Sequence, residues 1–99
     1  MSITPRRAAY DATLAAHAAY RVAILNAVRV LVADTTADAD TTLHLVLALN
    51  NHSTGYDVAS ELEEILVEFP THARDAVRAV VVAYRAVVGA NNAYSDLRR

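Results

Sequence analysis

Apolar residues recur every three to four positions along almost the whole chain, which is the spacing of amphipathic helices. Helix-start and helix-stop signals divide this pattern into four segments. Thr4 followed by Pro5 is typical of a helix start, and Pro70 ends the third segment. The expected helices span about 5–33, 42–50, 56–69, and 72–88 or beyond. The sequence therefore predicts an all-α fold, a compact four-helix domain with two long and two short helices that occupies residues 1–99.

A polar turn from Asp34 to Asp40 separates the first two expected helices. Its Asp and Thr side chains compete with helical hydrogen bonding and favour capping of the next helix. Asp34, Asp38 and Asp40 also suggest a calcium loop, but the turn glycine and the closing glutamate of such a loop are missing. We therefore expect capping at this turn.

One side of the first helix is expected to face the core. Its members form an apolar stripe at helical spacing: Tyr10, Leu14, His17, Ile24, Leu25, Val28, Leu31 and Val32. A histidine and an arginine, His17 and Arg21, lie four residues apart within this arc. We expect them to form a buried polar pair, since buried polar groups need partners. The alternatives are an arginine that extends outward along its stem, and a histidine that binds a ligand or acts as a general base.

The opposite side of the first helix is rich in small residues and has little polarity. A helix with little polarity on two opposite sides is usually covered by other helices on both sides. Small side chains allow another helix to approach closely. The sequence therefore predicts a homodimer whose interface includes Ala12, Ala15, Ala19, Val22, Ala23 and Val30. Alternatively, exposed alanines on a good helix need no partner.

Charge changes sign twice along the chain. Residues 1–33 carry a net +3, residues 34–69 carry −8 and residues 70–99 carry +3, so that the whole chain has a net charge of −2. An acidic stripe on the third helix is expected to face a partner, and it contains Asp57, Glu61, Glu64 and Glu68. A basic face on the fourth helix contains Arg74, Arg78 and Arg85. Alternatively, both are solvated faces with weak surface ion pairs.

Composition narrows the chemistry further. The chain has no cysteine and only two glycines, which excludes disulfides, thiol catalysis and Cys-ligated metals and disfavours a glycine-rich phosphate loop. None of the four histidines completes a metal-binding or catalytic motif, although His44 and His52 with Asp57 could meet if their loop folds back. We therefore expect no enzyme activity, no cofactor and no metal. With 21 alanines and no lysine, the composition is typical of a GC-rich genome, such as that of an actinobacterium or its phage.

These patterns together predict a small interaction or regulatory protein that acts through helix–helix association. Its partners would be a second copy of the chain and another protein. The acidic stripe and the basic face would select the partner and fix its orientation. No continuous apolar stretch of membrane-spanning length is evident, so a cytoplasmic location is expected. The near-neutral net charge of the chain disfavours nucleic-acid binding. In that alternative, the arginines of the fourth helix and of the termini would contact the nucleic acid. A ligand binder or enzyme that uses His17 and Arg21 is the other alternative.

Overall fold

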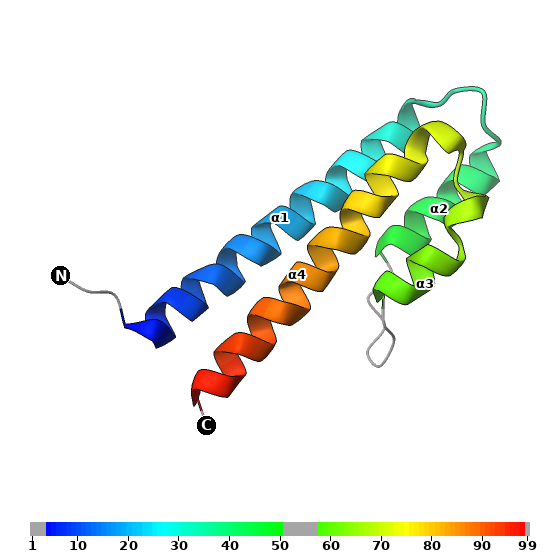
Figure 1. The fold of residues 1–99 in the computed structure, drawn as a ribbon. Coiled ribbons are helices and arrows are strands. Elements are labelled where there is room, and N and C mark those ends of the chain that lie inside the picture. Colours follow the sequence, from blue (N-terminus) through cyan, green and yellow to red (C-terminus); the bar gives the residue numbers. More distant parts are fainter. Residues whose placement is uncertain (1–3, 51–57, 99) are drawn as a thin grey trace.

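A computed structural model describes residues 4–50 and 58–98 and confirms the all-α class. Its helices are α1 (Pro5–Ala33), α2 (Ala39–Asn50), α3 (Val58–Glu64) and α4 (Arg74–Arg98), with 3₁₀ turns η1 (Leu66–Glu68) and η2 (Thr71–Ala73) between α3 and α4. The two long helices, α1 and α4, lie antiparallel and side by side, and α2 and α3 form a short pair against one end of them (Figure 1).

Capping residues set the first two helix starts. The Thr4 hydroxyl accepts a hydrogen bond from the Arg7 backbone N–H at 3.2 Å, and Pro5 follows at the first helical position. Asp38 accepts from the backbone N–H of Thr41 at 3.0 Å, so α2 begins at Ala39, three residues before the expected start at 42. The capping role expected of the Asp34–Asp40 turn is thereby confirmed for Asp38.

The third expected helix, over 56–69, is shorter in the structure. α3 ends at Glu64 and the chain then tightens into η1. Pro70 disfavours a helical conformation at the residue before it, and Phe69 is extended with φ −80° and ψ 144°. The Phe69 side chain is fully buried and anchors this turn in the core. After η2, α4 runs well past residue 88, to Arg98.

The core lies between α1 and α4 and beneath the α2–α3 pair. The two long helices also meet through aromatic side chains: the ring centroids of Tyr20 and Tyr84 are 5.7 Å apart, and those of Tyr10 and Tyr94 are 5.8 Å apart. Burial, with a smaller contribution from Tyr84, raises the pKa of Tyr20. The largest fully buried side chains are Phe69, Leu49, Leu62, Val77 and Val80.

The predicted core face of α1 is partly wrong. Ile24 and Leu31 are buried as expected and Val28 is partly buried. Five other members of the expected face are exposed: Tyr10, Leu14, His17, Leu25 and Val32. The buried side is instead centred on Thr13, Tyr20 and Ala27, about a quarter turn away. The small Ala27 is fully buried, whereas the larger Leu25 beside it is 55% exposed.

The molecule is long and flat, with extents of 55 × 28 × 17 Å. At 1.5 Å per residue, α1 is about 44 Å long and α2 only about 18 Å. The α2–α3 pair therefore forms a second layer over just one end of the α1–α4 pair (Figure 1).

Candidate functional site

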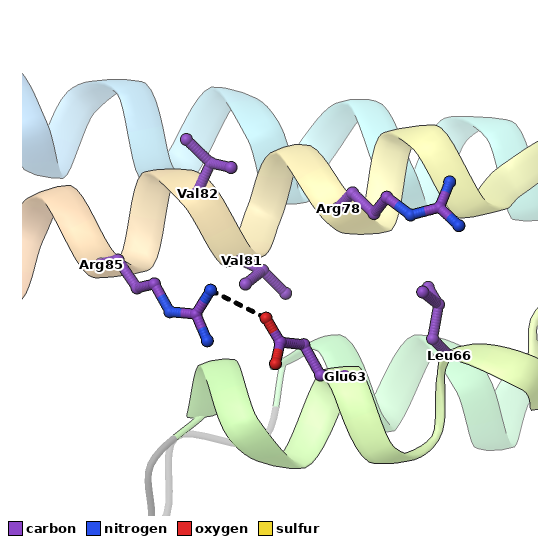
Figure 2. A pocket seen from close by; sticks show the side chains of 6 residues that line it. All are labelled: Glu63, Leu66, Arg78, Val81, Val82 and Arg85. Carbon is purple, nitrogen blue, oxygen red and sulfur yellow. Dashed lines mark ion pairs between the residues drawn. The ribbon is translucent and has the colours of Figure 1, made fainter.

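The groove between α3–η1 and α4 has an apolar floor and a charged rim. It has a volume of about 360 Å³, with Leu66, Val81 and Val82 as its apolar lining. Figure 2 shows Arg85 of α4 reaching across it to Glu63 of α3, and the Arg85 Nη1 to Glu63 Oε1 distance is 2.8 Å. This ion pair closes one end of the groove.

The predicted basic face is largely engaged within the chain. Arg74 donates from Nε to the Phe69 carbonyl and from Nη2 to the Val67 carbonyl, both at 3.1 Å. Arg78 Nη1 lies 2.9 Å from Asp75 Oδ1, and Arg85 is paired with Glu63 as above. Each of the three guanidinium groups therefore has a partner within the chain, and Arg74 holds the turn that follows α3.

The predicted acidic stripe is divided between two elements. Glu61 and Glu64 lie on α3, Glu68 lies on η1, and all three are exposed. Glu61 and Glu68 line one groove with Leu47 of α2, whereas Asp57 lies outside the described residues. Among described residues, these three glutamates form no ion pair, in contrast to Glu63.

The buried pair of His17 and Arg21 is not formed. Both side chains are exposed, because the core side of α1 lies about a quarter turn from them. His44 is also exposed, and His52 lies outside the described residues. Within 4–50 and 58–98, no group of three or more His, Asp or Glu side chains is close enough together to hold a metal ion.

The predicted alanine interface has two different environments. Ala12, Ala15 and Ala19 are exposed and Val22 is 66% exposed. Ala23 and Val30 are partly buried and pack against the core of their own chain. Ala23 and Val30 therefore have less surface left to offer to a partner.

Sequence reasoning missed a second surface on α1, because all of its members except Ala18 were assigned to the core-facing arc. Six residues follow one another at alternating spacings of four and three, and we call them the seam: Leu14, Ala18, Arg21, Leu25, Val28 and Val32. All are exposed except Val28, which is partly buried. This spacing is that of the contact positions of a coiled coil. Val28 packs against the core, and the other five members are left exposed by the described chain.

The seam borders a groove between α1 and α2. Val32 at the end of the seam lines this groove with Leu43 and Val46 of α2, and its volume is about 460 Å³. Leu43 and its neighbour one turn on, Leu47, are both more than half exposed. The seam and the outer side of α2 together form an exposed aliphatic surface that a second helix could cover.

α1 also has the length and apolar composition of a membrane-spanning helix. Among the described helices, it is long and apolar enough, by length and composition only, to cross a bilayer. Core helices of soluble proteins and signal sequences pass the same test, so the finding is weak evidence.

Comparison with known proteins adds no assignment. No family model, curated protein or solved structure matches the chain.

Proposed function

We propose that this chain is a non-enzymatic interaction protein that works by helix–helix association and pairs with a second copy as a homodimer. The observation that carries the proposal is the seam, an exposed row of residues at coiled-coil spacing. Five of its six members are aliphatic, and exposed apolar patches on a protein surface often mark an interaction site.

Two sides of α1 could form the interface: the seam, and the alanine face, which is the side that carries Ala12, Ala15, Ala19 and Val22. Large side chains favour the seam. Complete burial of a leucine or valine side chain contributes roughly 1.5–3 kcal/mol, and an alanine methyl contributes much less. Leu14, Leu25 and Val32 are each more than half exposed, so much of that contribution remains available.

Sedimentation at several concentrations tests this proposal. We expect the natural chain to sediment at twice its 10.7 kDa mass. Leu14→Gln combined with Leu25→Gln should weaken the dimer at least about tenfold, since two aliphatic contacts are lost from each copy. Val67→Gln is the control, because Val67 is as apolar and 76% exposed but lies on η1. A chain that remains monomeric at its highest soluble concentration contradicts the proposal.

A substitution on the alanine face distinguishes the two candidate interfaces. Ala19→Glu places a charge on that face while leaving the seam intact, so a dimer formed through the seam should tolerate it. Dissociation by Ala19→Glu, with no effect of the seam substitutions, would instead assign the dimer to the alanine face.

A further inference from the structure

The groove between α3–η1 and α4 has an arginine at each end of its apolar floor. On its α4 side the lining residues are spaced by three, one and three positions, so they share one side of the helix: Arg78, Val81, Val82 and Arg85. The two arginines are seven residues apart, which is about 10 Å along the helix. Figure 2 shows Val81 between them and Leu66 of η1 across from Arg78. The α4 side of the groove therefore presents an aliphatic strip with a basic group at either end.

The two ends of the groove differ in charge. Arg85 is neutralised by Glu63, which lies 2.8 Å away across the groove. Arg78 instead pairs at 2.9 Å with Asp75, whose side chain is 97% exposed and does not line the groove. An exposed pair of neighbours on one helix contributes little stability, so the Arg78 guanidinium group can leave Asp75 for another anion at little cost. An accessible positive charge therefore stands at the Arg78 end of the groove.

Size and polarity define the kind of molecule that fits this groove. Its volume of about 360 Å³ lies at the lower end of the range of small-molecule pockets, roughly 300–1,000 Å³. Leu66, Val81 and Val82 are complementary to an aliphatic body, which a free phosphate or a sugar lacks. A guanidinium group binds a carboxylate through two parallel hydrogen bonds, whereas it repels a cationic head group. The complementary ligand is thus a short hydrocarbon chain that ends in a carboxylate.

We propose that this groove binds a small aliphatic carboxylate. The carboxylate lies on the Arg78 guanidinium group, in place of Asp75, and the hydrocarbon chain runs along Val81 toward Arg85. The ion pair of Arg85 with Glu63 stands at the far end and limits the length of the chain. None of these residues belongs to the seam, so this inference is independent of the proposed self-association.

Titration with sodium octanoate tests the site when it is followed through the methyl signals of valine and leucine in NMR spectra. We expect saturable shifts of the Val81, Val82 and Leu66 methyl groups at concentrations below those at which octanoate forms micelles. Octylammonium chloride has the same hydrocarbon chain with the opposite charge. It should bind at least about tenfold more weakly than octanoate, because its head group is repelled by Arg78.

Two substitutions change the charge of the groove in opposite directions. Arg78→Gln should weaken octanoate binding at least about fivefold, because the carboxylate loses its charged partner. Glu63→Gln removes a negative charge and releases Arg85 from its ion pair, so octanoate binding should strengthen by about twofold or more. Arg29→Gln is the control, since Arg29 is an exposed arginine of α1 that does not line the groove. Circular dichroism of each chain checks that the helices are retained.

Several results would overturn the proposed site. Equal affinities for octylammonium and octanoate would show that the hydrocarbon chain alone is recognised. Equal losses in Arg78→Gln and Arg29→Gln would show a general attraction to a positive protein. Shifts that do not saturate, or that are as large at Leu14 and Leu25 of α1 as in the groove, would show unspecific binding to exposed aliphatic side chains. None of these results bears on the oligomeric state, which sedimentation measures separately.

Discussion

At the scale of single residues, Asp34 has the most distinctive electrostatic environment. Its carboxylate accepts hydrogen bonds from the Thr36 hydroxyl at 2.6 Å and from the Thr36 backbone N–H at 3.0 Å. The hydroxyl is the largest cause that lowers the pKa of Asp34, followed by the backbone N–H, and His72 at 3.7 Å adds a weaker attraction. The ionised carboxylate thus connects the end of α1 to η2.

We predict that Asp34→Asn changes the pH dependence of stability. A carboxyl group whose folded pKa is lowered stabilises the protein above its unfolded pKa, near 3.8, and this stabilisation is lost as the pH falls through the folded value. The natural chain should therefore exceed the variant in stability at neutral pH, and the difference should decrease below about pH 4. Urea unfolding across this range measures the effect. A difference that stays constant down to about pH 2 would contradict it.

At the scale of elements, the turn between α3 and α4 depends on one arginine. Arg74 donates to the carbonyls of Val67 and Phe69, which lie at the end of η1, and it begins α4. One side chain therefore joins the end of one element to the start of the next.

We predict that Arg74→Ala lowers the free energy of unfolding by about 1–2 kcal/mol, because two charge-assisted hydrogen bonds are lost. Arg78→Ala is the matched control on the same helix. Its exposed pair with Asp75 should contribute about 0.5 kcal/mol or less. Urea denaturation of the three chains provides the comparison, and equal losses in both variants would refute the special role of Arg74.

The helices could be predicted from the sequence more fully than their faces. Thr4, Pro5 and Pro70 act locally, so the start of α1 and the break before the last long helix follow from them. The inward side of α1 depends on α4, which is distant in sequence and lies along α1, and on that side the small Ala27 is buried while the larger Leu25 is exposed. The apolar stripe at helical spacing therefore indicated a side of α1 that is only partly buried. The seam became visible only when α4 and α2 were in place.

At the scale of the whole molecule, the second layer covers only part of the first. Val81 beneath α3 and η1 is 5% exposed, whereas Val88, seven residues further along α4, is 40% exposed. The first half of α1 similarly extends beyond α2 (Figure 1). We expect the ends of the long helices to open more readily than their covered parts.

We predict that amide hydrogen exchange of α1 depends on protein concentration. The proposed pairing covers the seam from Leu14 onward, so amides of residues 14–25 should become at least about fivefold better protected between dilute and concentrated samples. Amides of residues 89–96 of α4 lie outside the pairing and serve as the internal control. Equal changes in both segments would indicate general stabilisation instead of the proposed contact.

The proposed pairing of two identical copies has a consequence for how natural variation acts on this protein. In a two-fold assembly every altered position occurs twice, once in each subunit. A change that weakens one contact about tenfold therefore weakens the assembly about a hundredfold, because the two energies add. Single mutations in α1 would consequently have unusually steep effects on pairing, and a compensating change elsewhere in the seam would be repeated in the same way.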